Sequence, residues 1–221
     1  MCGDFSGVWS DTPEERHWLD WLNKKNFTTL FVDGNHENFD RLMGDEFQII
    51  DFHGGKAHKI RDNVYHLMRG YVFKICDKKI FAFGGALSHD IKDGILDPDD
   101  FNDLRDLVRK YNRLTRQGKL LRINHISWWK EEMPSTEEME FGLKTLEENN
   151  NEVDFIITHC CPQHVASIFS NGRYKPDALT SYFNTVSDNV KFSKWFFGHY
   201  HNEETILDKY TMLYNKIIRV V

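Results

Sequence analysis

Short apolar runs that end in polar or histidine-bearing loops are the main pattern along this chain. Thr28–Val32 is a β-branched and aromatic run that stops at Asp33 and Gly34, and Val153–Thr158 and Lys194–Phe197 lead into loops that carry histidines. Short apolar runs bounded by such residues are typical of buried strands. The pattern therefore predicts strands that present several histidine loops at the end of a sheet.

Capping residues and helical spacing predict helices between these strands. Thr12, with Pro13 next to it and Glu15 completing a capping box, predicts a helix that runs to about Lys25. The other expected elements are a helical turn at Asn38–Met43, a helix from Ser135 towards Glu147, short strands at Phe47–Asp51, Lys56–Ile60, Val64–Met68, Tyr71–Cys76 and Lys79–Phe83, and closing strands between Thr205 and Val221.

From Ser88 to about Asn150 the sequence is charged and helical in character. A helix is expected from Asp97 through Arg116, and a helical turn at Ser127–Lys130. We interpret residues 88–150 as a helical insertion beside the site, within a single domain that spans residues 1–221. Strands that end in ligand-bearing loops, with helices between them, predict an α/β fold in which two sheets pack face to face under outer helices.

Composition excludes several classes of protein. A hydrophobic content of 40% with 14% aromatic residues supports a sizeable core and argues against a disordered chain. The net charge of -6 argues against bulk positive charge as a means of holding nucleic acid, leaves a local basic groove open, and favours a small or metal-captured substrate. No stretch approaches the roughly 18 apolar residues needed to cross a bilayer, so no membrane role is predicted.

The cysteines show neither CxxC spacing nor the density of a disulfide framework. We therefore expect buried thiols in a reducing, cytoplasmic setting. The cysteines are Cys2, Cys76, Cys160 and Cys161.

Side chains that bind divalent metals stand at or near the ends of the predicted strands. Metal ions that act on phosphate esters take carboxylate, amide-oxygen and imidazole donors. Each short motif alone is more often ordinary turn chemistry, but together the motifs favour a metal site. The candidate ligands are Asp4, Asn35, His159, His199 and His201.

In their order along the chain, these motifs resemble those of the calcineurin-like metallophosphoesterase superfamily. Gly3-Asp4 resembles the start of GDxxD, Gly34-Asn35-His36-Glu37 matches GNH(D/E), His159 is the lone histidine after a strand, and Gly198-His199-Tyr200-His201 matches GHxH. The resemblance implies a four-layer α/β/β/α sandwich. The family's first motif, DxH, has no counterpart here, so we expect the first strand to be missing and hypothesise an N-terminally shortened form of a longer enzyme.

The resemblance also assigns roles to the candidate ligands. Asp4 would bridge two divalent ions, Mn, Fe or Zn, and a hydroxide bridging the ions would attack phosphorus in line. Asn35, His159 and His199 would complete the ligands of one ion, and His201 would be a ligand of the other. Because the second ion lacks its DxH ligands, the chain is expected to hold one ion or none and to have impaired activity.

A catalytic histidine and a weaker set of substrate-rim residues complete the expected site. By resemblance, His36 would protonate the leaving oxygen, and Glu37 would orient its imidazole. Ser88 and His89 follow two glycines at the end of a strand and are candidates for the substrate rim together with Glu37, with a plain turn as the alternative. The histidines without ligand spacing, interpreted as surface or core residues, are His17, His53, His58, His66, His125 and His164.

Departures from the family pattern narrow the expected function. Gly7 and Val8 stand where the second Asp and the Arg of GDxxDRG belong, which favours a phosphoesterase acting on a small phosphorylated substrate, a mono- or diester, over a protein phosphatase. One alternative is a non-catalytic binding module. Another is a nuclease-like phosphodiesterase, suggested by basic residues of the insertion, although a solvated helix face explains them equally well. These residues are Arg105, Arg109, Lys110, Arg113 and Arg116. The sequence indicates no oligomeric state.

Overall fold

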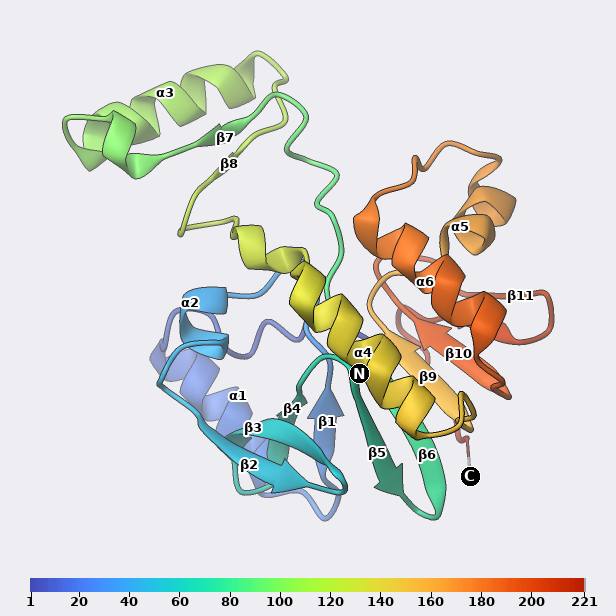
Figure 1. The fold of residues 1–221 in the computed structure, drawn as a ribbon. Helices are drawn as coiled ribbons and strands as arrows, with labels where there is room; N and C mark the ends of the chain where they lie inside the picture. The colour runs from blue at the N-terminus through green and yellow to red at the C-terminus, as the bar shows by residue number, and fades with distance from the viewer. Residues whose placement is uncertain (221) are drawn as a thin grey trace.

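Two principal β-sheets organise residues 1–220, the part of the chain that the computed structural model describes (Figure 1). The 4-stranded sheet has the order β1-β4-β3-β2. Its strands are β1 (Thr29–Phe31), β2 (Gln48–Phe52), β3 (Gly55–Arg61) and β4 (Val64–Leu67). Strand β1 runs parallel to β4, and the other neighbours are antiparallel.

The second sheet is 6-stranded, with the order β11-β12-β10-β9-β6-β5. Its strands are β5 (Tyr71–Ile75), β6 (Lys78–Phe83), β9 (Phe155–Thr158), β10 (Lys194–Phe197), β11 (Glu204–Ile206) and β12 (Tyr210–Met212). Strands β6, β9 and β10 are parallel neighbours. The carboxyl ends of these parallel strands therefore meet at one edge, where ligand-bearing loops can gather.

Three clusters of buried apolar side chains connect the sheets and helices. Leu19, Leu42 and Phe31 belong to a cluster that joins helices α1 (Pro13–Asn23) and α2 (Phe39–Leu42) to the 4-stranded sheet. A second cluster draws side chains from both sheets, including Val32 beyond β1 and Phe73 of β5. The fold is therefore mixed α/β, with apolar contacts between the sheets as well as between sheets and helices.

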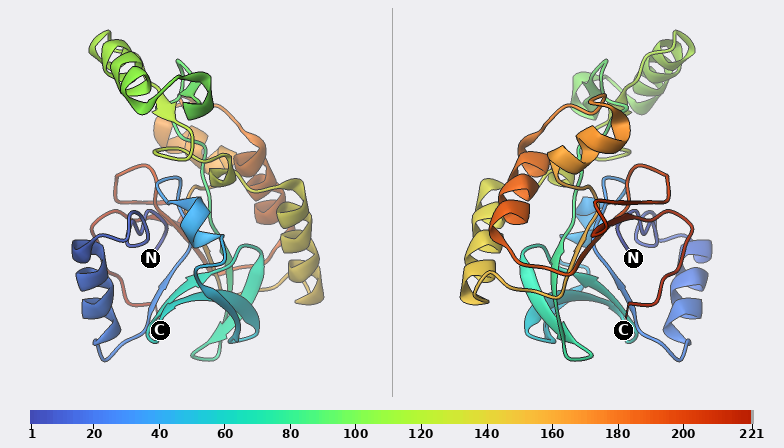
Figure 2. Two further views of the ribbon diagram at one scale, coloured as in Figure 1. Left: turned by 90° about the vertical axis from the view of Figure 1, so that its left-hand side faces the viewer. Right: turned by 90° about the vertical axis from the view of Figure 1, so that its right-hand side faces the viewer.

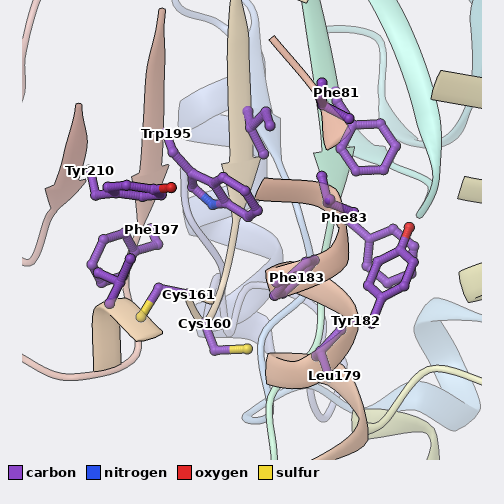
Figure 3. Close-up of a cluster of buried hydrophobic side chains, with 14 of the residues drawn as sticks. Phe81, Phe83, Cys160, Cys161, Leu179, Tyr182, Phe183, Trp195, Phe197 and Tyr210 are labelled. Atoms are coloured by element: carbon purple, nitrogen blue, oxygen red, sulfur yellow. The ribbon is translucent and has the colours of Figure 1, made fainter. Parts of the chain in front are cut away.

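The third cluster packs helices against the 6-stranded sheet (Figure 3). These helices are α4 (Thr136–Glu148), α5 (Gln163–Ser170) and α6 (Ala178–Asn189). Phe183 of α6 meets Phe83 of β6 and Trp195 of β10 in edge-to-face contacts. Leu146 of α4 is fully buried in the same cluster, so α4, which lies within the insertion expected at residues 88–150, contributes to the core.

Residues 91–128 form an arm that projects from the body (Figures 1 and 2). The arm contains β7 (Ile95–Leu96), the short 3-10 helix η1 (Pro98–Asp100), α3 (Leu104–Arg116) and β8 (Arg122–Ile123), and is followed by η2 (Lys130–Glu132). The expected continuous helix from Asp97 is wrong, because Asp97 caps η1 and Asp103 starts α3 separately by accepting from the Asp106 amide. The helical turn expected at Ser127–Lys130 corresponds to η2, which begins at Lys130, the last residue of the expected range.

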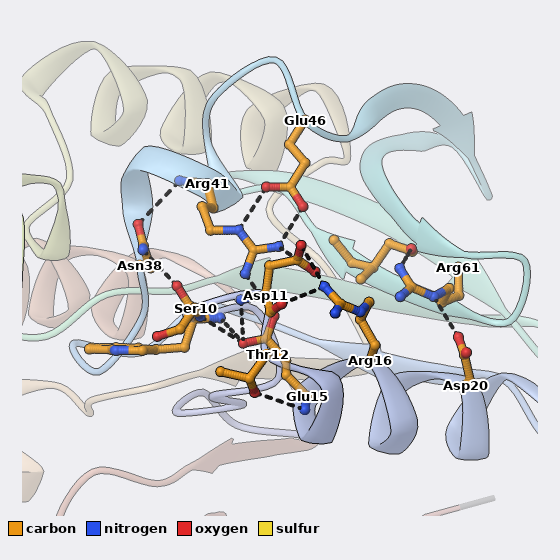
Figure 4. A network of polar contacts seen from close by, with 12 residues as sticks. Ser10, Asp11, Thr12, Glu15, Arg16, Asp20, Asn38, Arg41, Glu46 and Arg61 are labelled. Atoms are coloured by element: carbon orange, nitrogen blue, oxygen red, sulfur yellow. Dashed lines mark hydrogen bonds and ion pairs between the residues drawn. The ribbon is translucent and has the colours of Figure 1, made fainter.

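The expected short strands are confirmed with shifts of one or two residues at their ends, and α1 begins at Pro13 as predicted. The capping box predicted for Thr12 and Glu15 is wrong, because only the Thr12 side chain accepts from the Glu15 amide. The carboxylate of Glu15 instead accepts hydrogen bonds from the amides of Trp9 and Ser10, at 2.8 and 2.7 Å, and its second oxygen pairs with Arg41 at 2.7 Å (Figure 4). These contacts fix the segment between Asp4 and α1. Of the closing strands, β11 and β12 form, and Val221 lies outside the described residues.

No helix within residues 1–220 has the length and apolar character that a membrane crossing requires. The cysteines are free thiols: Cys160 and Cys161 are buried, as expected, whereas Cys76 is exposed in the turn between β5 and β6.

Candidate metal centre

Loops from four strands converge at one place in the fold. Asn35 follows β1, His159 follows β9 and His199 follows β10, while Ser88 and His89 lie beyond the end of β6. Asp4 reaches the same place because Cys2 forms a parallel bridge with Val32, directly beyond β1. The pairing of remote segments thus assembles a site whose members are far apart in the sequence.

Four of the five predicted ligands contact one another. Nε2 of His159 lies 3.1 Å from Oδ1 of Asn35 and 3.3 Å from Oδ1 of Asp4. Nδ1 of His199 lies 3.0 Å from the same Asn35 oxygen. We call Asp4, Asn35, His159 and His199 the donor cluster. The atoms that meet in these contacts are imidazole nitrogens and side-chain oxygens, all of which can bind a cation.

Hydrogen bonds outside the donor cluster orient its members. Nδ1 of His159 lies 2.6 Å from the carbonyl oxygen of Cys2, which can only accept, so this nitrogen carries a proton and Nε2 faces the cluster. The side-chain amide of Asn35 donates to Oγ of Ser88 at 3.1 Å, which turns Oδ1 towards the histidines. Contacts of this kind fix the orientation of metal-binding side chains.

Ser88 is in turn held by a buried carboxylate. Its hydroxyl donates to Glu132 at 2.6 Å, and its backbone amide donates to the other carboxylate oxygen at 2.9 Å. Glu132 is fully buried, and burial raises its pKa. Ser88 is itself buried and holds the Asn35 amide by a hydrogen bond, and it also lines a pocket beside the cluster, where a residue of the substrate rim was expected.

Two glycines allow the chain to approach this closely. A Cβ on Gly34 would lie 2.0 Å from Oδ1 of Asp4, and a Cβ on Gly3 would lie 2.1 Å from Nδ1 of His159. Gly3 also has a φ of 90°, which side-chain-bearing residues seldom adopt. The glycines of the Gly3-Asp4 and Gly34-Asn35 motifs are therefore required by the packing of the donor cluster.

The donor cluster contains a carboxylate, that of Asp4, whose charged neighbours are histidines. Burial alone would raise the pKa of Asp4, but the hydrogen bond and charge of His159 and the backbone amide of His36 hold it well below its usual range. Burial lowers the pKa of His199 strongly, and the nearby His159 and His89 add to this. Within residues 1–220, the only ion-pair partner of Asp4 is His159, so no lysine or arginine neutralises this carboxylate.

His36 and Glu37 follow Asn35 directly but differ in their surroundings. The His36 amide donates to Oδ1 of Asp4 at 3.0 Å, and the half-buried ring has a pKa lowered by burial. The rim position expected for Glu37 is wrong, because Glu37 is fully buried and accepts from the amides of Phe5 and Ser6 at 2.8 and 3.3 Å. Burial raises its pKa to about 8. Glu37 thus holds the loop after Asp4.

Of the two remaining predicted histidines, His201 lies away from the donor cluster and His89 lies next to it. His201 is exposed and its ring stacks on Tyr214 at 5.1 Å, and among residues 1–220 no hydrogen bond joins it to the donor cluster. His89, expected only at the rim, places its Nε2 2.9 Å from Nε2 of His199. The predicted ligand His201 therefore lies outside the donor cluster, whereas His89 borders it.

A second polar cluster lies beside the first. Arg69 donates to Oδ2 of Asp33 at 3.0 and 2.5 Å, and Nε2 of His66 lies 3.1 Å from Oδ1. His58 contacts His66 between their Nδ1 atoms at 3.0 Å. Burial would raise the pKa of Asp33, but the charge of Arg69 and the His66 hydrogen bond hold it well below its usual range. We call these four residues the Asp33 cluster.

All four members of the donor cluster were predicted from the sequence, but the groups that support it and most of the Asp33 cluster were not identified. The Cys2 carbonyl carries no side-chain signal, and neither Glu132 nor Arg69 stands in a recognisable motif. His58 and His66 were assigned as surface or core residues, and both are buried. Only the folded structure shows the hydrogen bonds that these groups make.

The donor cluster combines carboxylate, amide-oxygen and imidazole groups, the donors that divalent metal ions take in proteins. Donors bound to one ion with metal–ligand distances of about 2.1 Å lie roughly 3.0 to 3.4 Å apart, depending on geometry. The observed contacts between donors are 3.0, 3.1 and 3.3 Å. Within residues 1–220 no group of three or more His, Cys, Asp or Glu side chains forms a recognisable metal site. Asp4, His159 and His199 of the donor cluster are three such side chains and are not placed as a metal site by themselves, so the case for an ion depends on the amide of Asn35 as a further donor.

Comparison with known families found no family model that matches the chain. No curated protein matches it either. The functional interpretation therefore depends on the geometry of the site and the order of its motifs.

Proposed function

We propose that this protein is a metal-dependent phosphoesterase that hydrolyses phosphate mono- or diesters. The observation that carries the proposal is the convergence of Asp4 with Asn35, His159 and His199, which follow the carboxyl ends of three strands, and the contacts of 3.0 to 3.3 Å that join these donors in a row. The fold is compatible with it. Helices pack on each sheet and a further cluster draws on both sheets, an arrangement that supports the four-layer α/β/β/α sandwich of metallophosphoesterases.

The four residues of the donor cluster would hold the ion, and Mn, Fe or Zn are suited to this mixed set of oxygen and nitrogen donors. A divalent ion there supplies a Lewis acid for the phosphate oxygens and lowers the pKa of water. The chain itself positions the reacting groups. The backbone amide of His36 donates to Asp4, which anchors the residue next to the cluster, and its half-buried ring would protonate the leaving oxygen.

One ion, not two, is the proposed complement of this chain. The donor cluster supplies one complete set, and the exposed His201 stacks on Tyr214 instead of joining it. A second ion would depend on Asp4 and on groups outside this set. The proposal therefore predicts low turnover compared with dinuclear enzymes.

Hydrolysis of an aryl phosphate or a bis-aryl phosphodiester with added manganese tests the proposal. Asn35→Ala and His199→Ala are expected to abolish turnover, because each removes a ligand. Asn102→Ala and His17→Ala are matched controls at exposed positions away from the cluster. Turnover that survives in Asn35→Ala and His199→Ala would contradict the proposal, and metal binding without any turnover would favour a non-catalytic binding module.

A nuclease-like activity is a second candidate, favoured by the projecting helix α3. Its basic side chains are exposed, and Arg109, Arg113 and Arg116 line one shallow surface pocket of about 420 Å³. Cationic side chains on one helix face suit the phosphates of nucleic acid. DNA binding that weakens steeply with salt, and weakens further in Arg109→Glu, would support this candidate. Binding that is insensitive to salt would reject it.

A further inference from the structure

A pocket of about 710 Å³ lies beside the donor cluster. It is bounded by the loop after β6, by the end of α5 with the loop to α6, and by the residues after His199. His89 connects the two places, since it lines the pocket and its Nε2 lies 2.9 Å from Nε2 of His199. The volume falls within the range of roughly 300–1,000 Å³ that small-molecule sites occupy.

Aromatic rings form one wall of the pocket. The ring of Tyr174 lies 5.0 Å from that of His89 and 5.0 Å from that of Tyr200. Phe169 contacts Tyr200 at 4.9 Å, and Tyr200 contacts the ring of His199 at 4.8 Å. Tyr174 is only half-buried and lines the pocket. Aromatic side chains that line a pocket can stack against planar heterocycles.

Cationic side chains lie around the same pocket. Lys92, Arg173 and Lys175 line it and are exposed, and within residues 1–220 neither Lys92 nor Lys175 forms an ion pair. The acidic residue of the lining, Asp177, uses its carboxylate to accept from the Thr180 amide at the start of α6. In a chain with a net charge of -6, this local excess of positive charge favours an anionic ligand.

We propose that the pocket binds the base of a nucleoside phosphate whose phosphate group lies at the donor cluster. The base stacks against Tyr174, His89 lies between the pocket and the donor cluster, and Lys92 and Lys175 bind further negative charge. This inference rests on the proposed function for the hydrolytic step, and it names the substrate class. The binding itself can be measured without turnover.

Equilibrium dialysis with adenosine 5′-monophosphate and with ribose 5-phosphate, which lacks the base, tests the inference. The nucleotide is expected to bind about tenfold more tightly, because stacking of one base contributes that much. Tyr174→Ala is expected to remove the difference and Tyr174→Phe to keep it. Tyr111→Ala, on α3, is the matched control. Lys175→Gln is expected to weaken nucleotide binding severalfold, with Lys144→Gln on α4 as its control.

Equal affinity for the two compounds would overturn the inference, and so would a preference that Tyr174→Ala and Tyr111→Ala reduce equally. If the melting temperature shows that Tyr174→Ala is unfolded, Tyr174→Leu retains an apolar side chain and is expected to lose the preference in the same way. A retained nucleotide preference in a protein with no turnover would contradict the proposed hydrolysis alone.

Discussion

Asp4 and Asp33 are two carboxylates in neighbouring polar clusters, but their counter-charges differ in kind. Asp33 is paired with Arg69, whose guanidinium is always charged, and accepts a further hydrogen bond from His66. Asp4 faces His159, an imidazole whose charge depends on its proton. The Asp33 cluster is therefore neutralised by its own side chains, whereas the donor cluster needs a proton or a metal ion.

This difference separates a structural cluster from a ligand site. Breaking a buried pair with a permanent counter-charge leaves an unpaired charge and destabilises the fold. A cluster that relies on imidazole protons can exchange them for a metal ion, since metal binding releases protons from its ligands. We therefore expect substitutions in the Asp33 cluster to change stability, and substitutions in the donor cluster to change metal binding.

The largest expected effect is on stability and comes from Arg69→Leu. It leaves the buried Asp33 carboxylate without its cation, and the free energy of unfolding is expected to fall by about 3–5 kcal/mol. Asn35→Ala, the matched change in the donor cluster, is expected to cost about 1 kcal/mol in metal-free protein. Urea denaturation of both variants measures this. Equal losses of unfolding free energy in Arg69→Leu and Asn35→Ala would contradict the distinction between the two clusters.

The next effect is a pH dependence of stability that arises from His58. Burial, with the adjacent His66, lowers the pKa of His58 to about 4 from its ordinary 6.5. Because the folded state resists the proton, this contribution to stability is complete above pH 6.5 and is lost as the pH falls through 4. The loss amounts to roughly 3 kcal/mol over that range.

Denaturation curves between pH 7 and pH 4 for wild type and His58→Leu isolate this contribution. The variant is expected to lose less stability on acidification than the wild type. Identical pH dependence in the two proteins would show that His58 is not held neutral in the Asp33 cluster.

The smallest effect concerns Ser88, which orients Asn35 without belonging to the donor cluster. Ser88→Ala removes the hydrogen-bond acceptor that fixes the Asn35 amide, and metal affinity is expected to fall about 10- to 100-fold. Ser181→Ala, at an exposed position on α6, is the control. A titration with Mn²⁺ measures both. Unchanged affinity in Ser88→Ala would mean that Asn35 is oriented by other contacts.

The strands and α1 could be predicted because their signals are local. Apolar alternation, turn residues and the Thr12-Pro13 start lie within a few residues of each element. The break before α3 was missed because Asp103 caps a new helix in a sequence that also suits a continuous one. Local propensity does not decide between two caps of similar strength.

Asn35, His159 and His199 were identified because each follows a predicted strand in the order of a known family's motifs, whereas Asp4 was identified from the motif order alone. The hydrogen bonds and ion pairs around these ligands could not be predicted from the sequence. Ser88 and Glu132, or Asp33 and Arg69, meet only through long-range folding. His201 shares a motif with His199, but its ring stacks on Tyr214, a contact that the motif does not contain.

The most direct test of the central claim is to count the manganese ions bound per chain by equilibrium dialysis, in the wild type, in Asn35→Ala and in the control His17→Ala. The account predicts one ion per chain in the wild type and the control, and none in Asn35→Ala. No bound manganese in the wild type, or equal binding in Asn35→Ala, would contradict it, and two ions per chain would contradict the single donor set.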